Sequence, residues 1–199
     1  MILGFDHDDN TIFAAQREYL KEARVLHAMV GMLSAIPKTP LHARLAAEGR
    51  LDEEHEAEFG TNVIPVRMSR EELRDGYLQL LRELYAPTAY FDRLDDLFLR
   101  GTFRFSQARA AYWRRHPWSW LKGNATHLAR SAFIYCQLMR GVPEVALRRE
   151  YRRRIARLLR TRRDPVVLFV YLLKCVIHYH LHTMVGNMSV QQHRVVNTF

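Results

Sequence analysis

The sequence predicts a mostly α-helical protein with a small α/β portion at its N-terminal end. Two short apolar runs, residues 1–5 and 25–33, have the length and composition of buried parallel strands. Each run is followed by a stretch whose apolar residues recur at helical spacing, which is a β/α pattern. From Ser69 onward the strand pattern stops and helical periodicity takes over. Two strands cannot form a parallel sheet with covered faces, so the β/α portion is expected to need further strands.

The two helices of the β/α portion carry boundary signals. A helix is expected over residues 9–24, with Asp8 or Asp9 capping its N-terminus. A second helix is expected to open at Thr39-Pro40, because a capping residue followed by proline suits the first helical turn. Gly49 then closes it.

The rest of the chain is expected to be helical. Ser69 and Glu72 have the spacing of a capping box, which predicts a helix that Pro87 ends. Residues 101–122 are expected to hold shorter helices. Four further helices are predicted, over residues 90–98, 124–139, 143–163 and 164–184.

Composition indicates a folded protein of a reducing compartment. Apolar residues make up 48% and charged residues 26% of the 199 residues, which excludes a disordered chain. The two cysteines, Cys136 and Cys175, lie in separate apolar stretches, so no disulfide framework is expected. Acidic residues follow the first apolar run, the opposite of a signal peptide's basic start. We expect a cytoplasmic protein, with a peripheral position at a membrane left open.

The net charge of +9 is unevenly distributed. Residues 1–99 hold 11 basic and 18 acidic side chains, a net of −7. Residues 100–163 hold 17 basic and 2 acidic side chains, a net of +15, and the last 36 residues add +1. This asymmetry predicts two regions with different surroundings, of which the second suits an anionic partner.

Three stretches carry a family resemblance. Residues 2–13 place a glycine in an apolar strand and follow it with an acidic turn. Residues 30–51 hold an apolar strand, the turn Pro-Lys-Thr-Pro-Leu and then Glu-Gly-Arg-Leu. Residues 62–65 and 71–91 form the third stretch. Together they resemble the end of a radical S-adenosylmethionine (SAM) barrel and the helical extension of its cobalamin-binding members, including those similar to hopanoid methylases. In the turn Pro-Lys-Thr-Pro-Leu that follows the apolar strand, Lys38 stands where the family has glycine.

The resemblance implies a division of the chain and a set of cofactors. Residues 1–52 would be the C-terminal remnant of the radical SAM barrel, the last β/α units of a partial TIM-type barrel. Residues 53–199 would be a helical C-terminal extension domain of unknown function. The full-length family uses SAM, a 4Fe–4S cluster and cobalamin, and the resemblance implies that Met1 lies inside a longer frame. The expected partner is therefore the missing N-terminal radical SAM and cobalamin-binding portion.

The cluster-binding motif of that family is absent from this sequence. A radical SAM cluster needs three thiolates in a Cys-x3-Cys-x2-Cys loop. Cys136 and Cys175 are too far apart in sequence to form one. We therefore expect no cofactor to be bound by this chain alone and no catalytic residue within it.

The resemblance implies part of a SAM pocket. By analogy, Ile2 and Gly4 would approach the adenosine, with the glycine allowing close backbone approach. Met32 and Leu33 would lie beside the adenine. Asp6 would bind polar groups of SAM, although a carboxylate at a helix entry is an equal reading. Ordinary barrel-core packing remains the alternative for Ile2, Met32 and Leu33.

Two further groups of residues have a functional and a structural interpretation. His178 and His182 share one helical face, yet no third ligand accompanies them, so core or interface histidines are favoured over a metal site. Trp113, Trp118 and Trp120 either stack on a ligand or pack between helices, and packing is the commoner role.

The basic helix 144–163 is the strongest charge feature. Its apolar stripe makes it amphipathic, through Leu147, Tyr151, Ile155, Leu158 and Leu159. The favoured reading is a solvated helix whose arginines balance acidic partners in the missing part of the enzyme. An anionic membrane surface or lipid substrate comes next. Nucleic acid is disfavoured because no nucleic-acid-binding signature accompanies the arginines. The apolar run 166–173 is expected to be a core helix, too short to span a bilayer.

The sequence thus predicts a C-terminal fragment of a cobalamin-dependent-type radical SAM enzyme, with a methylase among the options. It would contribute part of the SAM pocket and a helical substrate-side domain, without catalytic competence of its own. The alternative is a non-catalytic basic helical module that binds an anionic membrane surface or nucleic acid.

Overall fold

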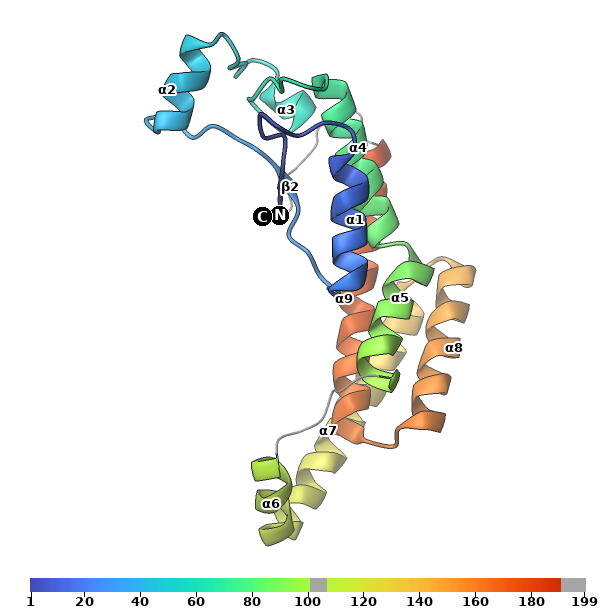
Figure 1. Ribbon diagram of the computed structural model, residues 1–199. Coiled ribbons are helices and arrows are strands. Elements are labelled where there is room, and N and C mark those ends of the chain that lie inside the picture. Colours follow the sequence, from blue (N-terminus) through green and yellow to red (C-terminus); the bar gives the residue numbers. More distant parts are fainter. Residues whose placement is uncertain (101–106, 191–199) are drawn as a thin grey trace. The chain divides into compact units, whose positions relative to one another are not determined.

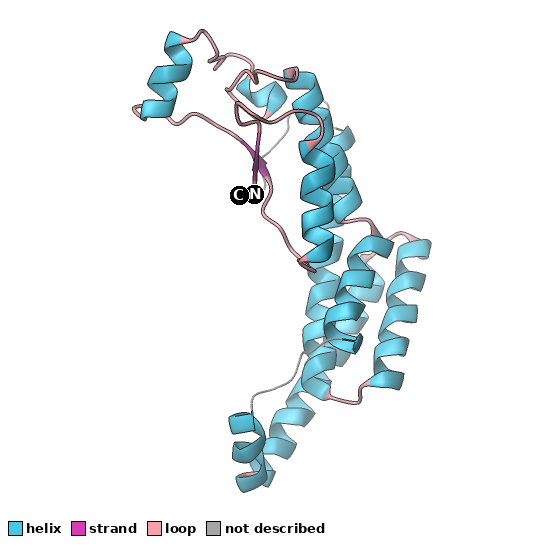
Figure 2. Cartoon of the chain, in the orientation of Figure 1, coloured by secondary structure: helices cyan, strands magenta, loops and turns pink. Residues whose placement is uncertain are grey.

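A computed structural model of the protein describes residues 1–100 and 107–190. Within these residues the protein is 69% helical and holds two short parallel strands, so the predicted class, mostly α with a small α/β portion, is confirmed. Figure 2 shows the strands as one small magenta element among helices. The described residues form two compact units, residues 1–86 with residues 182–190, and residues 87–181. The predicted boundary at residue 52 stays a prediction.

The first unit begins with a β–α–β arrangement. Strand β1 (Ile2–Leu3) leads to helix α1 (Ile12–Glu22) and strand β2 (Gly31–Met32). The strands are parallel, with Ile2 opposite Gly31 and Leu3 opposite Met32. Strand β2 is shorter than the predicted run 25–33.

The predicted cap of α1 is wrong. The helix begins at Ile12 after Thr11, so Asp8 and Asp9 precede its first turn. Asp9 instead accepts hydrogen bonds from the Thr11 amide and hydroxyl. Asp8 accepts from the backbone amides of residues 4 and 5, so it organises the turn after β1.

Helix α2 (Pro40–Ala47) has the predicted boundaries. Thr39 caps its N-terminus by accepting from the His42 amide at 3.2 Å, and Pro40 occupies the first turn. Gly49 follows with φ +66°, a left-handed conformation that glycine adopts without penalty. A small core is formed between the region after β2, α2 and the segment near residue 63, from Ala35, Leu45 and Val63.

Helices α3 (Glu56–Phe59) and α4 (Arg70–Leu84) complete this stretch of the first unit. The predicted capping box of α4 is present: the Ser69 hydroxyl accepts from the Glu72 amide at 3.0 Å, and the Glu72 carboxylate accepts from the Ser69 amide at 2.7 Å. Helices α1 and α4 lie side by side (Figure 1), and Gly76 of α4 faces the ring of Phe13. The absence of a side chain at residue 76 is what lets that ring reach the helix.

The second unit is helical throughout its described part. Helix α5 (Pro87–Asp95) runs into a π-helical turn, η1 (Asp96–Arg100). Helices α6 (Gln107–Arg115), α7 (Pro117–Gly141) and α8 (Val145–Thr161) follow, and α9 (Pro165–Val190) starts here. Helix α7 begins seven residues before the predicted Asn124, because Pro117 is tolerated at the first helical position. Shorter helices were predicted over residues 101–122, and the first part of that range, residues 101–106, lies outside the described residues.

The core of the second unit lies between α5, α8 and α9. It contains several large side chains that are almost fully buried, namely Tyr90, Phe91, Tyr151 and Tyr171. The apolar stripe predicted for α8 is buried except for Leu159, which is 44% exposed. Arg154 is buried in the same helix instead. Phe91 and Tyr151 meet edge to face with ring centroids 5.5 Å apart.

Helix α9 is longer than the apolar run that predicted it. Within the described residues it is the one helix whose length and hydropathy would allow it to cross a membrane, over Pro165–Met188 with a mean hydropathy of 1.4. The expectation that the apolar run 166–173 is too short for a span does not hold for the whole helix, which continues through Lys174 and the histidines. Tyr171, Cys175 and His178 are fully buried, whereas only 28% of the apolar window as a whole is buried, so one face of α9 packs in the core.

Candidate functional site

The carboxyl ends of β1 and β2 carry most of the predicted site residues. Ligands of parallel α/β proteins bind at this edge, in the loops that follow the strands. Gly4 follows β1 directly, with φ +93°, a conformation in which other residues are strained. A side chain there would place its Cβ 2.8 Å from the Leu73 Cδ2. The Asp8 carboxylate accepts from the Gly4 amide at 2.9 Å and fixes the turn.

The predicted residue Asp6 is held by two arginines. Its carboxylate accepts from Arg44 of α2 at 2.7 Å and from Arg50 at 2.8 Å. Hydrogen bonds from Arg44 and then Arg50 lower the pKa of Asp6 below its ordinary value of 3.8. Arg50 also donates to Glu48. Asp6 therefore joins the turn after β1 to α2 through ion pairs. These contacts favour a structural role for Asp6 over contact with polar groups of SAM.

The chain after β2 is tied down by the segment that precedes α4. The Thr61 hydroxyl donates to the Leu33 carbonyl. The Asn62 side chain accepts from the Ala35 amide at 2.8 Å and donates to the Ala35 carbonyl at 2.9 Å. The amide of Asn62 thus replaces a peptide group of a neighbouring strand. As a result, the backbone beside the predicted residue Leu33 is held in one conformation.

Strand pairing brings four of the five predicted residues together. Ile2, Gly4, Met32 and Leu33 lie within or directly after the paired strands, while Asp6 lies two residues beyond Gly4 at the salt bridges. Met32 is fully buried and Ile2 is 42% exposed. Contact of any of these residues with SAM remains a prediction.

The sequence did not predict the partners Arg44, Arg50, Thr61 and Asn62. Arg50 and Asn62 were inside stretches that carry the resemblance, but nothing local to them indicates which side chain they meet. Arg44 and Asp6 are 38 residues apart in sequence. Such contacts depend on the position of α2 relative to β1, which a sequence pattern does not determine.

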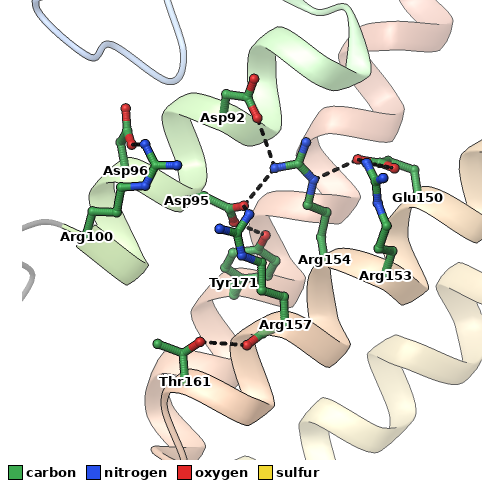
Figure 3. Close-up of polar contacts among 10 residues, drawn as sticks. All are labelled: Asp92, Asp95, Asp96, Arg100, Glu150, Arg153, Arg154, Arg157, Thr161 and Tyr171. Carbon is green, nitrogen blue, oxygen red and sulfur yellow. Dashed lines mark hydrogen bonds and ion pairs between the residues drawn. The ribbon is translucent and has the colours of Figure 1, made fainter.

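The second unit contains a buried polar cluster, defined here as Asp95, Arg154 and Tyr171 (Figure 3). Asp95 accepts from the Arg154 guanidinium at 2.7 Å and from the Tyr171 hydroxyl at 2.9 Å. Asp92 and Glu150 also accept from Arg154, at 3.0 and 2.7 Å. The arginines of α8 were expected to pair with acidic residues in the missing part of an enzyme. The acidic partners of Arg154 instead lie in this chain.

The surroundings of this cluster hold Arg154 and Tyr171 in one ionisation state each. Burial opposes the charge on Arg154, but hydrogen bonds to Glu150, Asp95 and Asp92 outweigh it and raise the pKa of the guanidinium. Burial, with Cys175 and Asp95 nearby, raises the pKa of Tyr171. Neither group is therefore suited to proton transfer near neutral pH, and the cluster is a structural ion-pair network.

His178 of the histidine motif lies in the core of the second unit. His178 is fully buried, and its Nδ1 lies 2.8 Å from the Tyr151 hydroxyl. Its ring packs against Tyr90 and Phe91, with centroids 4.6 and 5.1 Å away. Across residues 1–100 and 107–190, no group of three or more His, Cys, Asp or Glu side chains is placed to hold a metal ion.

The two cysteines do not form a cluster site either. Cys175 is fully buried, which raises the pKa of its thiol, whereas Cys136 is exposed. Two thiols, one of them held protonated by an apolar environment, do not supply the three thiolates that a 4Fe–4S cluster requires. The residues of this chain therefore do not fit the cluster.

Comparison with known proteins identifies the family. Residues 39–194 match the model of a domain of unknown function, DUF4070, and the chain belongs to this family. A protein of Synechocystis sp. named as an uncharacterized methyltransferase is 30% identical over 103 residues. That match covers 50% of this chain and 19% of the relative's length, so the chain spans about a fifth of the relative. No solved structure matches the chain.

Proposed function

We propose that this chain is the C-terminal part of a cobalamin-dependent-type radical SAM enzyme and that the whole enzyme is a methylase. In this proposal the edge of β1 and β2 completes a SAM pocket, and the helical second unit belongs to the substrate side. The chain has no catalytic competence alone. The name of the cyanobacterial relative supports a methyltransferase, and the family match supports a shared architecture over residues 39–194.

The observation that carries the proposal is the backbone at Gly4. The turn after β1 lies at the edge where ligands of parallel sheets bind, and it needs Gly4 because φ is +93° and Leu73 fills the place of a side chain. Ile2 has exposed surface beside it, while Met32 is covered by this chain and would support the strand from within. When bound, SAM supplies the methyl group or radical precursor. The residues here would bind and orient it.

The paired strands also support a larger assembly. Among the described residues, β1 and β2 pair only with each other. A two-stranded parallel sheet is marginal by itself. Further strands of a radical SAM barrel, on the expected N-terminal portion, would complete the sheet and bring the cluster-binding cysteines that this chain does not supply.

A first experiment examines the DNA around the gene. A frame upstream or adjacent, on the same strand, that encodes Cys-x3-Cys-x2-Cys supports the proposal, and the absence of such a frame contradicts it. The product of that frame is then produced together with this chain and loaded with iron and sulfide without oxygen. Reductive cleavage of SAM is measured as release of 5′-deoxyadenosine. We expect product from the pair and none from this chain alone.

A matched pair of glycine variants separates pocket from fold. Gly4→Ala and Gly49→Ala both put a side chain at positive φ, but only Gly4 lies at the strand edge. Both are made in a Leu73→Ala background, because the Cβ at residue 4 would otherwise lie 2.8 Å from the Leu73 side chain, and this background supplies the reference affinity. We expect Gly4→Ala to weaken SAM binding by the assembled pair at least tenfold in equilibrium dialysis. Gly49→Ala, where nothing lies within 4 Å of the added Cβ, should leave SAM affinity unchanged. Equal affinities for the two variants would contradict the proposed pocket.

An anionic membrane surface is a second candidate partner, because α8 exposes an arginine-rich face. Arg149, Arg152 and Arg160 are exposed and lie within about one third of the helix circumference. Replacing all three by glutamine should reduce binding to vesicles with one third phosphatidylserine, most at low salt. The control replaces Lys21, Arg24 and Lys38, an equal charge change. Binding to duplex DNA is measured in parallel, and no affinity for either would exclude this role.

A further inference from the structure

Helix α7 leaves most of its surface in contact with solvent. Of its 25 residues, only Ser131 and Leu138 are buried. Several of its large apolar side chains are exposed instead: Trp118 is 81% and Phe133 is 65% exposed, and Leu121 and Leu128 are half-exposed. Large apolar side chains that gather on a protein surface mark an interaction site.

These side chains form one stripe along the helix. At 100° per residue, they fall within roughly 140° of the helix circumference. The α7 stripe is defined here as Trp118, Leu121, Leu128, Phe133 and Cys136, with three alanines between them, all of them exposed. Trp118 and Cys136 are 18 residues apart, which is five full turns, so both point in the same direction. The stripe is therefore straight and covers most of the length of α7.

The charge around the stripe has one sign. Helices α6 and α7 hold six Lys or Arg side chains and no Asp or Glu. On α7, Lys122 lies within the arc of the stripe and Arg130 on its flank, and both are exposed. Trp, Phe and Leu on one side of a helix with cations beside them are typical of helices that lie in the interface of an anionic membrane. Tryptophan is enriched at that boundary because its ring is apolar and its N–H is polar.

Two features favour lipid over other anionic partners. Nucleic acid binds aromatic rings by stacking, which leaves no role for the aliphatic Leu121 and Leu128. An acidic protein surface would bury Lys122 within a contact, although lysine is depleted from the cores of protein interfaces. At a bilayer its stem stays with the apolar side chains while its ammonium group reaches the phosphates.

We propose that the α7 stripe docks onto the interface of an anionic lipid bilayer. Its large apolar side chains enter the boundary of the acyl chains, and Lys122 and Arg130 pair with lipid phosphates. The contact is made by apolar insertion, and so it differs from the electrostatic contact considered for the arginine-rich face of α8. It requires neither SAM nor the expected N-terminal portion. It therefore stands or fails separately from the methylase function.

Cys136 reports the docking directly, because it lies on the stripe and is exposed, whereas Cys175 is fully buried. Alkylation of the unaltered chain by a water-soluble maleimide is measured with and without phosphatidylcholine vesicles that contain one third phosphatidylserine. We expect Cys136 to react at least tenfold more slowly on the vesicle-bound chain. The control chain carries Cys136→Ser and Ala14→Cys, which moves the thiol to an exposed position of α1. Its rate should stay the same.

Three results of this measurement would overturn the proposal. The first is that the chain does not bind the vesicles. The second is that the bound chain reacts as fast as the free one, or that the thiols at residues 136 and 14 are slowed equally. The third is that a single-stranded oligonucleotide or the co-produced N-terminal portion protects Cys136 and the vesicles do not. That result would assign the stripe to nucleic acid or to a protein interface.

A pair of double variants then tests the insertion. Trp118→Gln with Phe133→Gln keeps the net charge and removes the most exposed apolar groups of the stripe. We expect its affinity for the same vesicles to fall at least tenfold in a sedimentation assay, since less apolar surface leaves water. Tyr19→Gln with Ile36→Gln is the matched control, because these side chains of the first unit are 60% and 67% exposed. Its affinity should be unchanged. Equal affinities of the two variants, with equal helix content by circular dichroism, would contradict the proposal.

Discussion

The Arg154 guanidinium lies 2.7 Å from the carboxylate of Asp95, 59 residues away in sequence. Arg154 is 5% and Asp95 is 2% exposed, so the pair is almost completely removed from water. The carboxylate also accepts from the Tyr171 hydroxyl, and Arg157 reaches it at 3.3 Å. Helices α5, α8 and α9 are thus joined at a single acidic side chain (Figure 3). Neutralising or removing one member leaves the others with an unsatisfied charge.

Arg154→Met is expected to lower the free energy of unfolding by about 3 kcal/mol, because it leaves the buried Asp95 with only the longer contact to the half-exposed Arg157. Urea denaturation followed by circular dichroism measures the change. Arg153→Met is the matched control, since this exposed neighbour pairs with Glu150 at the surface and should lose less than about 1 kcal/mol. Equal losses for the two variants would mean that the buried pair is not what holds these helices together. Combining Arg154→Met with Asp95→Asn should recover part of the loss.

Gly76→Ala is expected to destabilise the first unit by about 1–3 kcal/mol, since the new Cβ would lie 2.2 Å from the Phe13 ring. In a Phe13→Ala background the same substitution should stabilise by up to about 1 kcal/mol, through the better helix propensity of alanine. Gly186→Ala, in the interior of α9 with nothing within 4 Å, should behave like the second case in both backgrounds. A loss at residue 76 that persists without the Phe13 ring would refute the close contact.

Lys38→Gly is expected to stabilise the chain by about 1 kcal/mol. Lys38 has φ +67°, a left-handed conformation that costs about 1–2 kcal/mol for a residue with a side chain. Lys21→Gly, inside α1, should instead destabilise by about 1 kcal/mol. Thermal unfolding of the two variants gives opposite shifts in Tm if the conformation at residue 38 is left-handed. Shifts of the same sign would contradict it.

Asp6 is expected to make stability depend on pH in the acid range. Its pKa is lowered in the folded chain, so its contribution is present above the unfolded pKa near 3.8 and is lost as pH falls through the folded pKa. Asp6→Asn should therefore be less stable than the unaltered chain at pH 7, on the order of 1 kcal/mol, and the difference should be smaller at pH 2. Urea midpoints at both pH values measure this. A difference that is constant with pH would rule out the ion pairs with Arg44 and Arg50.

Signals within a few residues of each other predicted the helix ends well. The Ser69–Glu72 capping box, the Thr39-Pro40 start and Gly49 after α2 all formed as expected, because each depends on hydrogen bonds inside one turn. Asp9 failed as a cap, since a carboxylate two residues too early has another amide within reach.

Contacts between distant elements were beyond prediction. The apolar stripe of α8 indicated which face is buried, yet Arg154 lies on that face beside Asp95 and Leu159 does not. Charge alone placed Arg154 in solvent, and only the position of α5 explains its burial. Gly4 and Leu33, which are predicted to border SAM, came from a family resemblance. Their supports Asp8, Thr61 and Asn62 required the three-dimensional arrangement.

The close approach of Phe13 to Gly76 has a consequence for how sequences in this family can diverge. The two positions lie on α1 and α4, and the ring fills the space that a side chain at residue 76 would need. Neither position can change freely while the other stays as it is. Among relatives that keep these helices, a larger residue at the place of Gly76 should therefore occur together with a smaller one at the place of Phe13, as correlated replacements.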